Sequence, residues 1–118
     1  MIRLKRVYEP PSPEDGFRIL IERLWPRGLT KAAAAVDLWT KDVAPSPALR
    51  KWYAHDPARW QEFQKRYRHE LETNGSAVDQ LRSEIRSRKN VTFVYAAQDP
   101  DRNSALLLRQ YLAGKIKG

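Results

Sequence analysis

The amino-acid sequence predicts a small three-layer α/β domain with a mostly parallel four-stranded sheet and about four helices. Its 118 residues suit one hydrophobic core, so we expect a single domain over residues 1–118. Four segments have the apolar pattern of strands, and capped helical segments lie between the third and fourth strands and after the fourth. The run VTFVYAA at residues 91–97 is apolar, β-branched and aromatic, which is typical of a strand covered on both faces in a parallel sheet.

The first three strands are predicted from side chains that alternate along the chain. In residues 2–7, Ile2 and Leu4 point to one side, while Arg3 and Lys5 point to the other. Residues 36–43 carry a weaker pattern of the same kind. Residues 17–24 carry the clearest one, with Phe17, Ile19 and Ile21 on one face and Leu20 and Leu24 on the other.

Two connections bear on the direction of these strands. About ten residues join the second strand to the third and include a short helix capped by Thr30, which is close to the minimum for a parallel crossover. The loop at residues 8–16 is too short for a helical crossover. The first strand is therefore either antiparallel or at an edge of the sheet, and the sequence leaves both alternatives open.

The helices are predicted mainly from the residues that cap them. They begin, in chain order, at Ser46-Pro47, at Asp56-Pro57, at Ser76 and at Asp99-Pro100. The second helix extends to about residue 73 and carries one apolar stripe, formed by Trp60, Phe63, Tyr67 and Leu71. The third helix places Asp79 in a capping box with Ser76 and turns its apolar side chains toward the core: Val78, Leu81 and Ile85.

The charge of the chain points to an anionic partner. There are 22 Lys and Arg residues against 14 Asp and Glu residues, which gives a net charge of +8. Each half of the chain carries half of this excess, so the charge belongs to the folded body rather than to a tail. We therefore expect a basic surface that meets a phosphate-bearing ligand.

Several classes of chemistry are excluded by what the sequence lacks. It contains no cysteine, which excludes disulfides, thiolate metal sites and cysteine nucleophiles. Its two histidines, His55 and His69, have no ligand-spaced companion, so no metal site is expected. The glycine-rich patterns of dinucleotide and P-loop sites are missing, and we expect no cofactor. The chain has no long apolar segment and no signal-peptide pattern, so we expect a cytoplasmic protein without contact to a membrane.

Four motifs resemble those of a known family. They are KRVY (residues 5–8), DGFRILIERLWPRG (15–28), PSPALRKWY (45–53) and YAAQDPDRNSA (95–105). Together they are similar to the YeaO-like proteins, the family called domain of unknown function 488. The resemblance covers nearly the whole chain and implies a small bacterial or archaeal cytosolic protein with an α/β fold and no established activity.

The hexapeptide RLWPRG is the first candidate for a binding site. It follows the clearest predicted strand, and open α/β sheets bind ligands at the carboxyl ends of their strands. Two guanidinium groups, from Arg23 and Arg27, flank the ring of Trp25, which suits a phosphate or carboxylate beside a flat surface. The full set of predicted anion-binding residues is Arg23, Trp25, Arg27, Gly28, Thr30, Lys31, Lys41, Arg50 and Asn103.

A purely structural interpretation of this segment stays open. Arg23 and Arg27 would then pair with Asp99 and Asp101, and Trp25 would fill part of the core. The same two aspartates are candidate acid–base residues, because neighbouring carboxylates raise one another's pKa, although they also suit a helix cap.

Basic residues on the helices form the second candidate. Arg82, Arg86 and Lys89 recur on one face of the third long helix, and such a stripe is suited either to solvent or to a nucleic-acid backbone. We expect the protein to bind a phosphate-rich polyanion, most plausibly nucleic acid without sequence specificity. The alternative is an enzyme that acts on a phosphorylated or carboxylated small molecule, with arginines as a clamp and Asp99 or Asp101 as acid or base. A third interpretation, a protein-interaction subunit, requires Trp25 to lie in a large exposed apolar patch.

Overall fold

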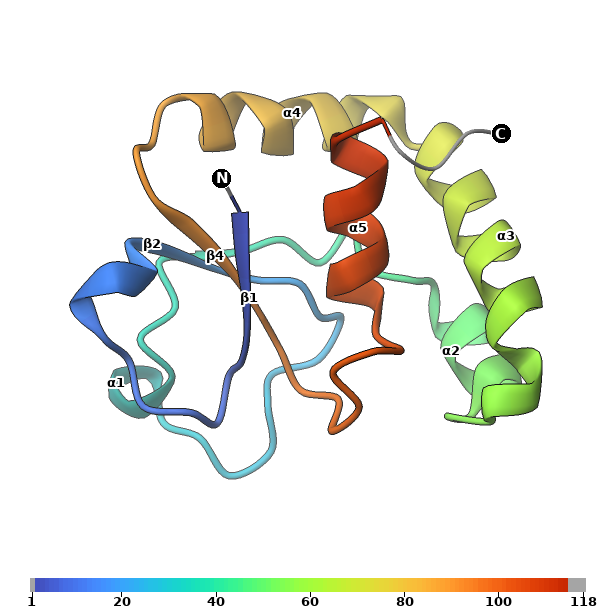
Figure 1. Cartoon of the computed structure of the whole chain (residues 1–118), viewed down its shortest axis with the longest axis horizontal. Coiled ribbons are helices and arrows are strands. Elements are labelled where there is room, and N and C mark those ends of the chain that lie inside the picture. Colours follow the sequence, from blue (N-terminus) through green and yellow to red (C-terminus); the bar gives the residue numbers. More distant parts are fainter. Residues whose placement is uncertain (1, 115–118) are drawn as a thin grey trace.

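The structure, a computed structural model, describes residues 2–114 and is built on a four-stranded sheet (Figure 1). Its strands are β1 (Ile2–Arg6), β2 (Phe17–Leu20), β3 (Leu38–Trp39) and β4 (Val91–Tyr95), in the spatial order β1-β4-β2-β3. All neighbouring pairs are parallel. The predicted fold class is confirmed, and β1 proves to be an edge strand that runs parallel to β4.

Helices lie on both faces of this sheet. One face packs against α2 (Pro47–Tyr53), α3 (Trp60–Glu72), α4 (Gly75–Arg86) and α5 (Ser104–Leu112), around a core that includes Ile19, Phe93 and Tyr67. The short α1 (Lys31–Ala34) covers the other face, where Leu20 and Val94 are buried. Figure 1 shows α4 across the end at which the strands begin, with α3 and α5 on the side opposite α1. None of the helices in residues 2–114 is long and apolar enough to span a membrane.

The connection from β1 to β2 is a loop with one 3-10 turn, η1 (Pro13–Asp15), in place of a helix. The buried carboxylate of Asp15 binds Arg18 at 2.7 Å and Lys5 at 3.1 Å. The backbone carbonyl of Asp15 accepts a hydrogen bond of 2.8 Å from the hydroxyl of Thr92 on β4. These contacts hold the loop across the sheet, so that a short segment returns the chain to the start of a parallel strand.

The ionisation of Asp15 reflects this network. Burial raises the pKa of Asp15, but hydrogen bonds from the backbone of Ser12 and from the side chains of Lys5 and Arg18 outweigh it and lower the pKa to about 2. Arg18 is itself buried and also donates to the carbonyl oxygen of Ala34 at 2.8 Å. The positive charge of Arg18 is thereby neutralised inside the protein.

All four predicted strands extend beyond the observed ones, and two of them differ most. β2 ends at Leu20, although the N–H of Ile21 still donates to the carbonyl of Val94, and Leu24 is 67% exposed rather than part of the sheet. The predicted strand at residues 36–43 is reduced to Leu38–Trp39, because the chain turns back between Lys41 and Ala44. Both ends lie where the chain leaves the sheet to build the region at its carboxyl edge.

Helix caps are confirmed at some ends and corrected at others. Ser46 and Thr30 accept backbone N–H groups of α2 and α1 as predicted, and Asp56 caps the 3-10 turn η2 (Pro57–Arg59) that leads into α3. The predicted capping box of Ser76 is wrong, since α4 begins at Gly75 without a side-chain cap. The last helix begins at Ser104 with Asn103 as its cap, because Asp99 caps the turn just before it.

Candidate functional site

The RLWPRG segment turns its most distinctive side chains inward. The guanidinium group of Arg23 donates to the backbone carbonyls of Ala44 and Pro45, both at 3.2 Å. The indole N–H of Trp25 donates to the carbonyl of Leu29 at 2.7 Å, and its ring meets that of Trp39 edge-on, with centroids 5.4 Å apart. Arg23 thus joins two loops, and Trp25 closes the smaller core.

Other residues of the same segment remain at the surface. The side chains of Arg27 and Lys31 are exposed, and the backbone carbonyl of Arg27 accepts a hydrogen bond from the hydroxyl of Tyr8. Gly28 has a φ of +81°, a conformation that favours glycine. Thr30 uses its hydroxyl to cap the single turn of α1. Neither Arg27 nor Arg23 forms an ion pair with Asp99 or Asp101 in the described chain, so the pairing that the structural interpretation expected is absent.

Lys41 contacts Trp39, the tryptophan that packs against Trp25. Its ammonium group sits 4.1 Å from the centre of the Trp39 ring, a cation–π contact. The predicted anion-binding residues are therefore distributed over several environments rather than gathered around Trp25.

Two of the predicted residues, Arg50 and Asn103, meet at a cavity of about 210 Å³, which we call the rim cavity. It lies between α2, the start of α5 and the segments that follow β2 and β4, at the lower end of the sheet in Figure 1. Its polar and aromatic lining includes Glu22, Arg50, Tyr53, His55, Arg102 and Asn103. This is the carboxyl end of parallel strands, the place where open α/β sheets bind ligands.

Glu22 supplies the carboxylate of the rim cavity, and the sequence patterns did not single it out. One carboxylate oxygen accepts the N–H of Ala96 at 3.0 Å. On the other side of the same segment, the guanidinium group of Arg6 donates to the carbonyls of Ala96 and Ala97. The pKa of Glu22 is raised above its ordinary value because of burial, although the hydrogen bond from Ala96 and the nearby Arg50 and His55 act in the opposite direction.

The predicted acid–base pair has a different environment. Asp99 accepts the backbone N–H groups of Asp101 and Arg102, and it also pairs with the guanidinium group of Arg102 at 3.2 Å. The hydrogen bond from Asp101 is the main cause of a lowered pKa at Asp99. Asn103 is buried, and its amide group donates to the carbonyls of Asp99 and Pro100. These contacts order the turn before α5 and do not favour a proton donor.

His55 borders the rim cavity from a strained backbone. Ala54 and His55 have φ values of +49° and +57°, both in the left-handed region although neither residue is a glycine. Strained positions of this kind concentrate at functional sites. The His55 ring also lies 6.1 Å from that of Tyr53, centre to centre.

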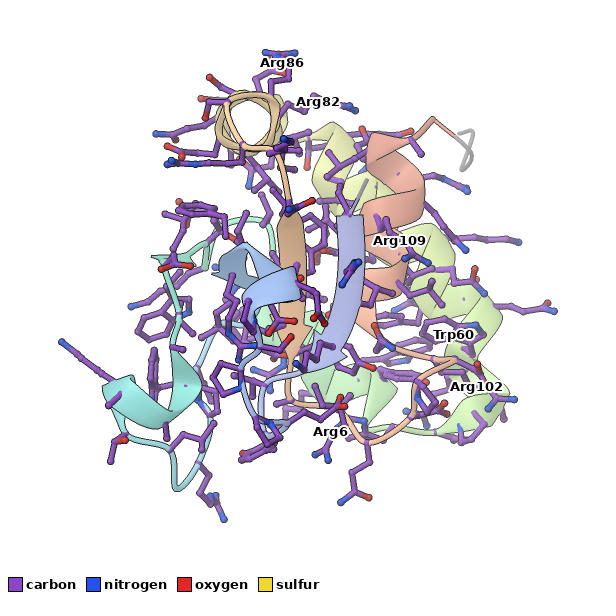
Figure 2. The ribbon with its side chains drawn as sticks, turned by 60° about the vertical axis from the view of Figure 1, so that its left-hand side comes forward. Arg6, Trp60, Arg82, Arg86, Arg102 and Arg109 are labelled. Atoms are coloured by element: carbon purple, nitrogen blue, oxygen red, sulfur yellow. The ribbon has the colours of Figure 1, made fainter. Side chains whose placement is uncertain are left out.

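A second hollow opens at the opposite end of the sheet, between α4 and α5. This α4–α5 groove has a volume of about 750 Å³ and is lined by three arginines among apolar residues: Ile2, Arg82, Ile85, Arg86, Arg109, Gln110, Leu112 and Ala113. Figure 2 shows Arg82 and Arg86 on α4, Arg109 on α5, and Arg6 and Arg102 at the far end of the molecule. No carboxylate lines the groove within residues 2–114. The sequence pattern predicted Arg82 and Arg86 as part of a basic face, but it did not associate Arg109 with them.

Comparisons with known proteins place the chain among relatives of the same length. The sequence pattern of a family described as the inactive DUF488-N3 subclade matches residues 1–118. The uncharacterised protein Rv3073c of Mycobacterium tuberculosis is 44% identical over 114 residues, which cover 97% of this chain and 95% of the relative. The uncharacterised protein YeaO of Escherichia coli is 37% identical over 111 residues, covering 94% and 96%. No solved structure matches the chain.

Proposed function

Because the chain belongs to the DUF488 family, and to a subclade described as inactive, we propose that it acts by binding and that its ligand is the phosphate backbone of nucleic acid. The observation that carries the proposal is the α4–α5 groove, whose described lining contains three arginines and no carboxylate. Phosphate contacts of this kind provide affinity without reading the base sequence.

Two of the three arginines of the groove, Arg82 and Arg109, are held in place and still have free donors. One N–H of Arg82 donates to the carbonyl of Leu112 at 2.8 Å, and one N–H of Arg109 donates to the carbonyl of Ile2 at 3.2 Å. A guanidinium group has five N–H donors, so most of them stay available. Side chains that are already ordered lose less conformational entropy when a ligand binds.

The arginines of the groove belong to the larger group of described cations that form no ion pair. Within residues 2–114, six other cations form ion pairs with carboxylates: Lys5, Arg18, Arg59, Arg66, Arg88 and Arg102. Arg82, Arg86 and Arg109 form none with described residues. Their combined charge is therefore directed to solvent or to a ligand.

The segment after β2 has a smaller part in this proposal. Arg27 and Lys31 are exposed and add positive charge outside the groove, whereas Arg23 is engaged with carbonyl groups. Trp25 is half-buried against Trp39, which disfavours stacking on a base and agrees with contacts to the backbone alone. The enzymatic alternative gains no support from Asp99, whose pKa is lowered rather than raised.

The test is a salt titration of nucleic-acid binding. Fluorescence anisotropy with a labelled DNA duplex and with single-stranded RNA should show affinity that falls with salt, with a log–log slope of about −0.9 for each phosphate neutralised on the duplex. Arg86→Gln and Arg109→Gln should each reduce the magnitude of that slope by about 0.9, the value for one phosphate contact.

Lys51→Gln is the matched control, because it removes an exposed charge on α2 that lies outside the groove. Arg27→Gln reports on the segment after β2. Binding that does not respond to salt, or groove variants that behave like Lys51→Gln, would exclude this function.

A further inference from the structure

We propose that the rim cavity is a separate site for a small oxyanion that keeps a hydroxyl group, such as hydrogen phosphate or a singly protonated phosphate monoester, which donates its O–H to Glu22 and turns its charge toward Arg50 and Arg102. This site lies at the carboxyl end of the sheet, away from Arg82 and Arg86 (Figure 2). It does not depend on the nucleic-acid proposal.

The carboxylate of Glu22 is oriented but only partly used. The N–H of Ala96 fixes one of its oxygens, and the other accepts no hydrogen bond from described residues. Ala96 is itself held by Arg6 through its carbonyl group, so the segment that orients Glu22 is fixed from two sides. An ionised carboxylate only accepts hydrogen bonds, and a ligand that meets the free oxygen must therefore supply a hydrogen.

The cations of the cavity account for the charge of the ligand. Arg50 is exposed, has no ion pair or hydrogen bond through its side chain with described residues, and is close enough to favour ionisation of Glu22. Arg102 pairs with Asp99 through one nitrogen, but Asp99 does not line the cavity. The lining thus combines one carboxylate with two guanidinium groups that do not neutralise it directly. An anion that also carries an O–H group can donate to the carboxylate and accept from the guanidinium groups.

The surrounding backbone keeps this arrangement open. Arg23 holds the carbonyl of Pro45 on one wall, and the left-handed residue His55 lies on another. Asn103 uses its side chain to cap α5 and to bind the preceding turn, so it shapes the wall and leaves ligand recognition to its neighbours.

This chemistry predicts a choice between two anions of equal size and charge. At mildly alkaline pH, hydrogen phosphate and sulfate both carry two negative charges, but only hydrogen phosphate has an O–H to donate. Sulfate would bring an acceptor oxygen against the acceptor oxygen of Glu22, and an unmade buried hydrogen bond is costly. We expect the full chain to bind phosphate about tenfold or more tightly than sulfate.

The experiment titrates inorganic phosphate and sulfate into isotopically labelled protein and follows the amide signals by NMR. The expected result is a phosphate response at Ala96 and Ser104 that sulfate reproduces only at much higher concentration. In Glu22→Gln the amide oxygen can still accept the N–H of Ala96 while an NH2 donor takes the place of the free oxygen, so the preference should be lost, and Arg50→Gln should weaken both anions. Glu14→Gln, at an exposed position in η1, is the matched control and should leave both affinities unchanged.

Equal binding of the two anions by the unmodified chain would overturn the proposal, and this measurement does not depend on whether any variant folds. A preference that survives Glu22→Gln would do the same, as would signals that shift around Arg82 and Arg109 instead of Ala96. Since Arg86→Gln leaves the rim cavity intact and Glu22→Gln leaves the groove intact, failure of one proposal is distinguishable from failure of the other.

Discussion

Arg23 of the RLWPRG segment and the arginines of the α4–α5 groove differ in what surrounds their guanidinium groups. Arg23 directs two N–H groups at the carbonyls of Ala44 and Pro45, inside the junction of two loops. Arg82 and Arg109 each direct one N–H at a carbonyl and keep the rest toward an open hollow. Loop carbonyls at the end of a sheet need donors, and a nearby arginine supplies them. A dense arginine motif therefore does not by itself indicate a ligand site.

The largest effect is expected at the most enclosed arginine, Arg18, through its partner Asp15. Asp15→Asn removes the buried negative charge and leaves Arg18 uncompensated, which should lower the free energy of unfolding by about 3–5 kcal/mol. Denaturation in urea measures this change directly. Glu14→Gln, next to it but exposed, should have almost no effect.

The same pair predicts how stability depends on pH. The pKa of Asp15 falls from 3.8 to about 2 on folding, so its ionised form stabilises the folded state by about 2 kcal/mol. That contribution is present above about pH 4 and is lost as the pH falls through the folded-state pKa of about 2. The unfolding free energy of the native chain should drop over this range, and Asp15→Asn should remove this part of the drop. An unchanged acid profile in the variant would contradict the assigned ionisation.

Arg23 and Arg27 test the contrast between enclosed and exposed arginines most directly, because they belong to the same motif. Arg23→Ala removes two donors from half-buried carbonyls and should lower stability by about 1–3 kcal/mol. Arg27→Ala removes an exposed side chain and should change stability by less than about 0.5 kcal/mol. Thermal and urea unfolding of the two variants provide the measurement. Destabilisation by several kcal/mol at Arg27 would show that its guanidinium group is structural as well.

The fold was largely predictable because its signals are local. The continuous apolar run of β4 and the stripe of α3 each lie within one segment and are buried as expected, whereas in β1 only Arg3 is exposed, since Lys5 turns to the buried Asp15. The end of β2 was not predictable from alternation, because Ile21 and Leu24 fit a strand that the chain in fact leaves after Leu20. The extra residues instead form a loop at the carboxyl edge.

The sites were less predictable because they arise where distant segments meet. The sequence predicts Arg50 and Asn103 as anion-binding residues, and both line one cavity. It places Glu22 within the pattern of a strand. Glu22 lines the cavity because β2 ends before it and the segment after β4 then lies beside it, where Ala96 donates to its carboxylate. Arg109 lies on a helix far along the chain from Arg82, and neither helical pattern contains information about how α4 and α5 pack.

A small effect is expected at Lys41, between those at Arg23 and Arg27. Its ammonium group lies over the Trp39 ring at 4.1 Å but remains exposed, so the contact should contribute only about 0.5–1 kcal/mol. Lys41→Gln should lower the unfolding free energy by that amount, while Lys41→Arg should retain most of it. Because Lys41 lies outside the α4–α5 groove, Lys41→Gln should alter the salt dependence of nucleic-acid binding no more than Lys51→Gln does. A larger loss of binding at Lys41 would extend the nucleic-acid surface from the groove to β3, and the distinction between enclosed and available cations would then have to be redrawn.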